Sequence, residues 1–375
     1  MLPNDYQPSK LNLKQLQNQA KDLLKAQKKG DKTAIERIHQ NHPHYANFSI
    51  EKILDLKFQL TEAQLIIARE NKFKSWPKLK AYIEMGELTL SIAPVIEIDK
   101  LEAEAKSKLD KIGAYTKVDQ NGHVTSVSFN GRKFSDSDLE HIETLYSLKK
   151  LSIVTTSITD SGLNHLKKLA NIESLYIIKT PVSDEGLQNL THLTTLNELA
   201  LGRTNISDKG LEYIKGLNSI ELLALNNTRI TNEGIKNLED LTSLKTLYIN
   251  KTQVTNEGLV SLKKLKKLEV LGLYGLDLTD IGLQYLTDLS NLKTLYLGQT
   301  QISNNGLQYL QNLTKLQMLD ITSTKVTDDG LKYFRNIPNL KELSTYSDEI
   351  TEDGLEQLKT MKGLKIRNYK KENNH

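Results

Sequence analysis

Apolar residues recur along most of this chain in two alternating patterns. Residues 148–154 read LKKLSIV, in which Leu148, Leu151 and Ile153 follow an L-x-x-L-x-L spacing that returns at residues 172–177. Alternation at its centre places every second side chain on one face of a strand. The next stretch, ITDSGLNHLKKL (158–169), has apolar residues at helical spacing. The pattern predicts a strand, a turn and a short helix.

The glycine of the second stretch returns every 24 residues without insertion or deletion. An earlier stretch, FSDSDLEHI (134–142), has Asp138 in place of the glycine and begins the array. One unit buries about seven apolar side chains, worth roughly 10–20 kcal/mol, but ordering its backbone costs ~1–2 kcal/mol per residue. A single unit should therefore not fold, whereas stacked units share one core in a solenoid. The nine glycines are Gly162, Gly186, Gly210, Gly234, Gly258, Gly282, Gly306, Gly330 and Gly354.

The repeat, with its T-x-[IV]-[ST]-D-x-G-L-x-x-L motif, resembles the leucine-rich repeat family of the bacterial kind. The resemblance covers residues 124–366 as about ten 24-residue repeats. It implies an α/β fold, a leucine-rich-repeat solenoid with a parallel sheet on the concave side and helices on the convex side. Asn121-Gly122, between two alternating runs, predicts a hairpin that covers the first coil. Residues 97–113 before it have the pattern of an amphipathic helix.

Residues 9–84 do not share the repeat and predict a small all-α domain of three or four helices. The string QAKDLLKAQKKGD…HP…LTEAQLIIARENKFKSWPKLK resembles a helical module found ahead of ankyrin repeats in many bacterial proteins, and no activity comes with that likeness. Trp76, before a proline, is interpreted as the core anchor of this domain. The expected domains are 1–86 (helical), 87–123 (linker helix and capping hairpin), 124–366 (repeats) and 367–375 (polar tail).

Two polar features of the repeat have structural interpretations. The Ser/Thr–Asp/Asn pair, as in Thr159-Asp160, is expected to cap its own helix; a calcium ladder is the alternative, which neutral Asn232, Asn256 and Asn304 in the same slot disfavour. The threonines that close each strand segment are expected to bond the backbone of the neighbouring coil. They are Thr156, Thr180, Thr204, Thr228, Thr252, Thr300 and Thr324.

Composition narrows the possible chemistry. The chain has no cysteine, so disulfides and thiolate sites are excluded, and this fits a cytoplasmic location. No phosphate loop, serine elbow or zinc-protease helix is present, so we expect no enzyme, no catalytic residue and no cofactor. His39, His42 and His44 cluster, but a helix end explains them and no metal site is expected.

The net charge of +4 is uneven, because residues 1–86 hold 15 Lys/Arg against 9 Asp/Glu whereas residues 124–375 hold 30 of each. Lys21, Lys25, Lys28 and Lys29 form a basic stripe, and Lys72, Lys74, Lys78 and Lys80 surround Trp76. Such a stripe can bind nucleic acid or an anionic membrane. A solvated helix face is the more common explanation, and both partners are disfavoured.

The expected concave face concentrates tyrosine. Five of the chain's 15 tyrosines fall at outward strand positions of one sheet, and tyrosine and arginine are enriched in protein-binding surfaces. The alternative is that tyrosine simply suits exposed strands. The candidate partner-binding residues are Tyr176, Ile178, Lys179, Arg203, Asn226, Tyr248, Asn250, Lys251, Tyr274, Tyr296, Asp320 and Tyr346.

The sequence therefore predicts a cytoplasmic protein–protein interaction module, or scaffold, that binds a protein partner on its concave sheet. Lys179, Arg203 and Lys251 favour a partner with an acidic surface. Two alternatives stay open: a host-directed bacterial effector that captures its target with the repeats, and a nucleic-acid or membrane adaptor that acts through the basic N-terminal helices. The sequence does not determine the oligomeric state.

Overall fold

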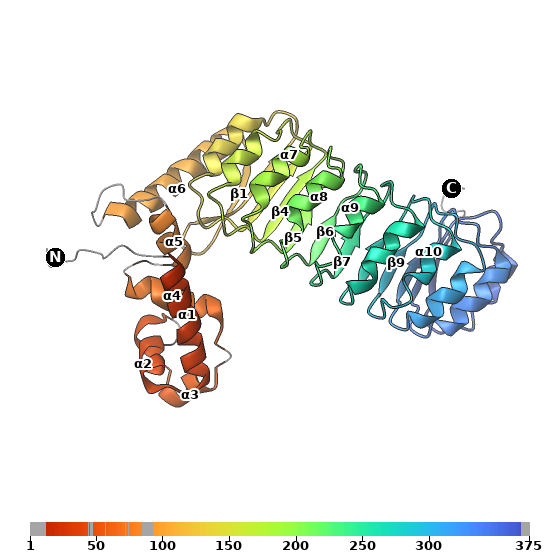
Figure 1. The fold of residues 1–375 in the computed structure, drawn as a ribbon, viewed down its shortest axis with the longest axis horizontal. Coiled ribbons are helices and arrows are strands. Elements are labelled where there is room, and N and C mark those ends of the chain that lie inside the picture. The colour runs from red at the N-terminus through yellow and green to blue at the C-terminus, as the bar shows by residue number, and fades with distance from the viewer. Residues whose placement is uncertain are drawn as a thin grey trace. The chain divides into compact units, whose positions relative to one another are not determined.

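The structure is a computed structural model that describes residues 13–43, 45, 48–56, 58–71, 73, 75–84 and 93–368. These residues form two compact units (Figure 1). One extends to Ser107 and includes Thr144–Ser147; the other consists of Lys108–Glu143 and the chain from Leu148. Helix α6 (Ala93–Ile112) lies where the linker helix is expected and continues from one unit into the other. The expected boundaries of the four domains stay a prediction.

The N-terminal unit has a helical core, as expected. Five helices precede α6 in the described residues, one more than the sequence predicts, because the five-residue α3 begins at a Ser49 cap that the apolar spacing does not reveal. Trp76 is 8% exposed and packs with Leu16, Ile38 and Ile66 in one apolar cluster, which confirms its place in the core. The helices are α1 (Leu13–Lys28), α2 (Lys32–Asn41), α3 (Ile50–Leu54), α4 (Leu60–Glu70) and α5 (Trp76–Glu84).

The second unit is the expected solenoid. Its 12 strands form one sheet in sequence order, antiparallel between β1 and β2 and parallel from β2 onward. Parallel neighbours from β2 to β11 are offset by 24 residues, so that Leu175 pairs with Leu199. The hairpin of β1 and β2 is present at the expected place. The strands are β1 (Tyr115–Val118), β2 (Val124–Asn130), β3 (Lys150–Val154), β4 (Ser174–Ile178), β5 (Glu198–Ala200), β6 (Leu222–Ala224), β7 (Thr246–Tyr248), β8 (Val270–Gly272), β9 (Thr294–Tyr296), β10 (Met318–Asp320), β11 (Glu342–Thr345) and β12 (Lys365–Asn368).

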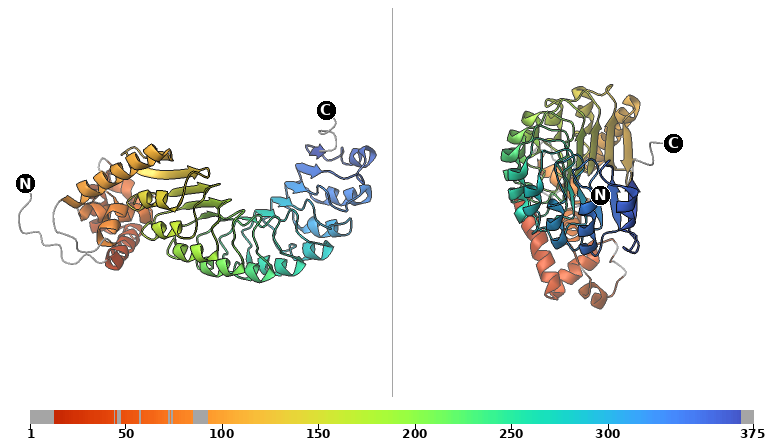
Figure 2. Two further views of the ribbon diagram at one scale, coloured as in Figure 1. Left: turned by 90° about the horizontal axis from the view of Figure 1, so that it is seen from above. Right: turned by 90° about the vertical axis from the view of Figure 1, so that its right-hand side faces the viewer.

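Short helices cover the opposite side of the coils. In this unit the strands line the concave side and the helices the convex side (Figure 2), with the leucines and isoleucines of both layers buried between them. The fold class is therefore confirmed. The α-helices are α7 (Asp184–Leu187), α8 (Asp208–Ile214), α9 (Asn232–Lys236), α10 (Asp280–Gln284) and α11 (Glu352–Glu356). The 3₁₀ helices are Asp136–Ile142, Gly162–Leu166, Gln188–Leu190, Asn256–Lys264, Gly306–Asn312 and Asp328–Asn336.

The repeated aspartates join successive coils rather than cap their own helices, whereas the neighbouring Thr231 and Thr351 hydroxyls do accept from a backbone N–H of their own helix, as expected of the pair. The carboxylate of Asp160 accepts from the Ser183 backbone N–H at 2.7 Å and from the Ser183 hydroxyl at 2.6 Å, one coil further on. In the asparagine coils the backbone bond is kept, but the Asn232 amide donates to the Thr255 hydroxyl. The side chains in this role are Asp136, Asp160, Asp184, Asp208, Asn232, Asn256, Asp280, Asn304 and Asp328.

This ladder also explains the strict glycine. A methyl carbon added at Gly186 would lie 2.5 Å from Asp160 Oδ1, closer than any van der Waals contact allows. Each of the nine repeat glycines faces the ladder side chain of the preceding coil in the same way. None of the nine has a positive φ. The position therefore needs glycine for its lack of a side chain rather than for backbone freedom.

Six of the seven threonines that close the strand segments bond within their own coil, contrary to expectation. The hydroxyls of Thr204, Thr228 and Thr300 each donate to the carbonyl three residues earlier, at 2.6 Å. The last two described residues fall at the start of the polar tail expected from residue 367. Arg367 and Asn368 belong to β12, because Arg367 pairs with Ser344 in the sheet. Residues 369–375 lie outside the described residues.

Candidate binding site on the concave sheet

The outward residues of the strands form a straight column, as predicted. Strand pairing places Tyr176 beside Ala200, Ala224 beside Tyr248, and Tyr296 beside Asp320. Because every strand is offset by the same 24 residues, side chains far apart in sequence become neighbours one strand apart, at ~4.8 Å. The column is Ser128, Ser152, Tyr176, Ala200, Ala224, Tyr248, Gly272, Tyr296, Asp320, Ser344 and Arg367.

Two tyrosines of this column meet across an intervening strand. The ring centroids of Tyr248 and Tyr296 are 6.3 Å apart, although β8 lies between their strands. Gly272 on β8 allows this approach, since a methyl carbon there would lie 2.6 Å from Tyr248 Cδ1. Both rings are half-buried, and burial, followed by the charges of neighbouring groups, raises the pKa of Tyr296. The pair presents apolar ring area toward the concave side.

Tyr176 lies in a different environment on β4. Its hydroxyl donates to the carboxylate of Glu198 on β5, and the Lys150 ammonium lies 4.7 Å from the centre of its ring. Burial and the adjacent Glu198 carboxylate, in that order, raise the pKa of Tyr176 to about 12. The phenol is therefore neutral and fixed in orientation at neutral pH.

The next outward column carries asparagines whose orientation is set by the coil that follows. The Asn226 side-chain oxygen accepts from the Asn250 backbone N–H at 3.1 Å, and the Asn250 oxygen accepts from the Tyr274 backbone N–H at 2.8 Å. A backbone N–H can donate only to the oxygen of a side-chain amide. These contacts therefore determine which atom of each asparagine amide is the oxygen and which is the nitrogen. Both nitrogens remain as donors at the surface.

A line of residues with left-handed backbone follows that column. Lys179, Arg203 and Lys251 have φ of 55°, 57° and 54°, a conformation that costs about 1–2 kcal/mol for a residue other than glycine. Each backbone N–H is compensated by a carbonyl of the next coil, as from Arg203 to Asn226 O at 2.8 Å. These three side chains are exposed, and within the part of the chain that the structure describes they form no ion pair.

A hollow of about 360 Å³ opens among these columns. It brings together six of the predicted site residues: Ile178, Arg203, Asn226, Asn250, Lys251 and Tyr274. Sequence reasoning did not select four further lining residues, Ala200, Gly202, Ala224 and Asn227. Three of these are small and lower the sheet surface between larger neighbours. The signal for two of them in the sequence is the pair Ala200 and Ala224, which stands at 24-residue spacing between Tyr176 and Tyr248.

The other predicted residues lie on the same face but do not line this hollow. Asp320 accepts from the Thr322 backbone N–H at 2.9 Å, and its charge adds to burial, the larger cause, in raising the pKa of Tyr274. Tyr346 follows β11 and is 44% exposed. The candidate site therefore consists of the hollow, the adjacent Tyr248–Tyr296 pair and scattered outer residues.

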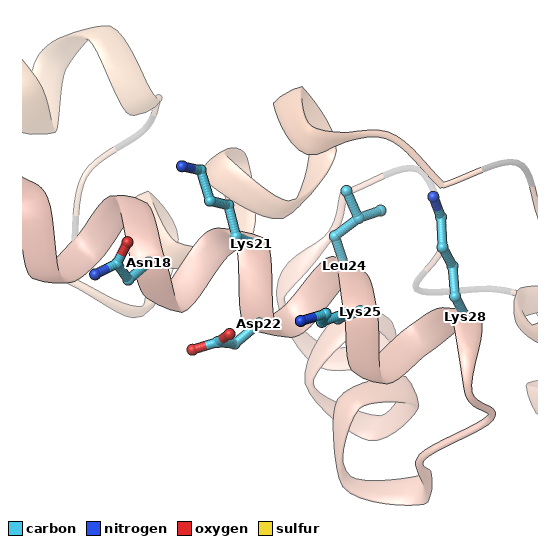
Figure 3. A pocket seen from close by; sticks show the side chains of 6 residues that line it. All are labelled: Asn18, Lys21, Asp22, Leu24, Lys25 and Lys28. Carbon is cyan, nitrogen blue, oxygen red and sulfur yellow. The ribbon is translucent and has the colours of Figure 1, made fainter.

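The alternative basic surface lies on α1. A hollow of about 500 Å³ beside this helix is lined by Asn18, Lys21, Asp22, Leu24, Lys25 and Lys28. Lys21, Leu24 and Lys28 point to one side and Asp22 to the other (Figure 3). All six residues come from one helix, so this is an exposed flank rather than an enclosed site, although it is the larger of the two hollows.

Of the lysines expected around Trp76, the structure describes Lys78 and Lys80. Lys78 is 1% exposed, which removes it from any basic surface, while Lys72 and Lys74 lie outside the described residues. Of the three histidines, His42 is buried and stacks on Tyr45 with ring centroids 3.9 Å apart, and His44 is not described. Nowhere in the described ranges do three His, Asp or Glu side chains gather as a metal site requires.

Comparisons with known proteins bear on the repeat. A family model described as "Leucine Rich repeat" matches residues 192–215, 240–263 and 312–334. No curated protein matches the chain. These three segments of the solenoid are therefore similar to leucine-rich repeats.

Solved structures also match. An internalin C2 from Listeria monocytogenes is 25% identical, with a TM-score of 0.45, over 66% of this chain and 96% of its own. An internalin, inlF, from the same organism is 20% identical, with a TM-score of 0.45, over 72% and 96%. A complex described as PEPR1-AtPEP1 is 17% identical, with a TM-score of 0.42, over 68% of this chain and 36% of that one. In the described residues, no helix has the length and apolar character needed to cross a membrane.

Proposed function

We propose that this protein is a protein-binding module whose partner lies on the concave sheet. The observation that carries the proposal is the combination of a recessed, small-residue floor with two large, half-buried rings beside it: Ala200 and Ala224 line the hollow, and the Tyr248–Tyr296 pair lies next to it. Surfaces of this composition favour proteins, because aromatic rings contribute much buried area with little loss of side-chain freedom.

The charges of this face favour an acidic protein over nucleic acid. Lys179, Arg203 and Lys251 are exposed on one edge, whereas lysines elsewhere on the coils pair with glutamates, as Lys149 does with Glu173 at 2.9 Å. Three cations are few for a phosphate backbone, which requires a longer basic track. The absence of cysteine fits a reducing compartment such as the cytoplasm, and we place the interaction there.

The test is affinity capture from native cell lysate, read by mass spectrometry. The bait is the wild type beside Tyr248→Ala/Tyr296→Ala, which removes both rings of the concave pair. The matched control is Tyr213→Ala/Tyr309→Ala, because these two tyrosines lie on the convex side, where their hydroxyls accept from the side-chain amides of Gln188 and Gln284.

We expect a protein that the wild type and the convex control retain and the concave variant loses. Truncating two rings of a binding surface costs about 1–2 kcal/mol each, or roughly 30-fold to 1,000-fold in affinity together. If all three baits retain the same proteins, the concave sheet is not the binding site. A set of proteins retained by all three but lost after Lys21→Gln/Lys28→Gln would favour the basic α1 surface instead.

A further inference from the structure

The hollow on the concave sheet presents hydrogen-bond donors and no negatively charged side chain. Its ten lining residues include Arg203 and Lys251 but neither aspartate nor glutamate. We propose that it binds the carboxylate of an aspartate or glutamate side chain in an acidic segment of the partner protein. This inference rests on the proposed function, since it assigns a chemistry to one part of the same face.

The asparagines give the hollow its polarity. The oxygens of Asn226 and Asn250 are both occupied by backbone N–H groups of the following coils. Each amide nitrogen carries two hydrogens and cannot accept a hydrogen bond. Each oxygen thus has one of its two lone pairs in use, whereas both amide nitrogens can donate to a partner, and donors match an acceptor-only carboxylate.

The two cations occupy the rim. Arg203 and Lys251 are exposed, and the Lys251 ammonium lies 5.4 Å from the centre of the Tyr274 ring. This cation–π contact holds the lysine beside the hollow without neutralising its charge. In the described part of the chain neither cation has an acidic partner. A bound carboxylate would supply the missing negative charge, and a guanidinium can hold it through two parallel bonds.

The floor sets the size of the occupant. Ala200, Gly202 and Ala224 leave a volume of about 360 Å³, at the small end of the range of ligand pockets. This is space for one or two side chains rather than for a cofactor. A single acidic side chain can therefore enter while the rest of the segment crosses the sheet and contacts the Tyr248–Tyr296 pair.

The test uses hexaglutamate and hexaglutamine peptides, both capped at their termini and carrying a neutral dye, with binding read by fluorescence anisotropy. One variant, Arg203→Gln/Lys251→Gln, removes the rim charges. Its matched control is Lys263→Gln/Lys332→Gln, which removes two convex-side lysines that lie over Tyr285 and Tyr333 as Lys251 lies over Tyr274. Another variant, Ala224→Leu, fills the floor and keeps all charges.

We expect the wild type to bind hexaglutamate but not hexaglutamine. Losing two partly exposed charge pairs weakens binding roughly tenfold, ~1.4 kcal/mol, and Ala224→Leu weakens it by a similar factor, whereas the convex control stays within about twofold. Circular dichroism first establishes that each variant is folded. If Ala224→Leu does not fold, Arg203→Gln/Lys251→Gln tests the proposal by itself. Equal loss in the convex control, or unchanged binding in a folded Arg203→Gln/Lys251→Gln or Ala224→Leu variant, overturns the proposal.

Lysate capture separates this inference from the proposed function. If Tyr248→Ala/Tyr296→Ala loses a protein that Arg203→Gln/Lys251→Gln retains in full, the concave site stands and the carboxylate assignment is wrong. If both variants retain every protein, the proposed function fails as well. Loss of the same protein by both variants supports both.

Discussion

Replacing Gly186 by alanine tests the explanation given for the repeat's glycine. The added methyl would lie 2.5 Å from Asp160 Oδ1, so this oxygen must move by about 1 Å to restore a normal contact. Its bond from the Ser183 N–H, now 2.7 Å, would then exceed the hydrogen-bonding range, and the movement of the carboxylate would also break the 2.6 Å bond from the Ser183 hydroxyl to the other oxygen, Oδ2. Two bonds to a carboxylate contribute about 1.5 kcal/mol each, and alanine's helix preference returns up to ~1 kcal/mol. The expected loss is about 2 kcal/mol.

The double-mutant cycle with Asp160→Ala separates this steric cause from a general intolerance of alanine. Asp160→Ala alone should cost about 3 kcal/mol for the two lost bonds. In the double variant the methyl no longer meets the carboxylate, so the total should stay near 2–3 kcal/mol rather than the ~5 kcal/mol of an additive pair. The free energy of unfolding is measured by urea titration with circular dichroism.

The matched control for this cycle is Gly216→Ala in a neighbouring coil. Gly216 is exposed, has an ordinary negative φ, and a methyl there would meet no atom within 4 Å. Its replacement should be neutral or stabilising by less than ~1 kcal/mol. Additive losses from Gly186→Ala and Asp160→Ala would refute the steric explanation, as would a loss at Gly216 equal to that at Gly186.

Two further predictions concern the tyrosines of the concave face. Gly272→Ala places a methyl 2.6 Å from Tyr248 Cδ1 and should displace the ring, so that partner capture falls as in Tyr248→Ala/Tyr296→Ala while unfolding changes by less than ~1 kcal/mol; unchanged capture would argue against the ring pair. The pKa of Tyr176 is raised to about 12 in the folded protein, above the ~10 of an unfolded tyrosine. The stability it contributes is therefore present below pH 10 and lost as pH rises toward 12, because the unfolded state releases its proton first. Tyrosinate absorbance should contain a late-titrating phenol that Tyr176→Phe removes; an identical titration curve would contradict the assignment.

The sequence predicted the sheet well because one number, the 24-residue period, determines strand order and register together. Once Leu175 pairs with Leu199, every outward position is assigned, and Tyr176, Tyr248 and Tyr296 share a column as expected. The same period could not show which groups the side chains of the repeat hydrogen-bond. Asp160 lies at the start of its own helix, and only the separation of the coils decides that its carboxylate meets Ser183 of the next one.

The candidate site was less predictable than the sheet. Its hollow depends on where small residues lie as well as on where aromatic and charged residues lie. Taken one at a time, Ala200, Gly202 and Ala224 do not indicate a binding site. The hollow forms because the fold places these small residues next to one another on one surface. The donor character of Asn226 depends on a contact with the Asn250 backbone, which follows from the separation of coils rather than from residue type. The extra strand β12 was missed because Lys365–Asn368 has no apolar alternation to indicate it.

The ladder of aspartates and asparagines gives the solenoid a fixed unit of growth. Its bonds always connect a side chain to the residue 23 positions later, as Asp184 connects to Ser207 and Asn304 to Thr327. Duplicating or deleting one whole coil would preserve every such bond, whereas inserting a single residue between Asp184 and Ser207 would displace both the bond and the glycine that faces it. The concave surface can thus lengthen only by whole strands, each of which adds ~4.8 Å. The length of surface available to a partner therefore changes in steps of one strand.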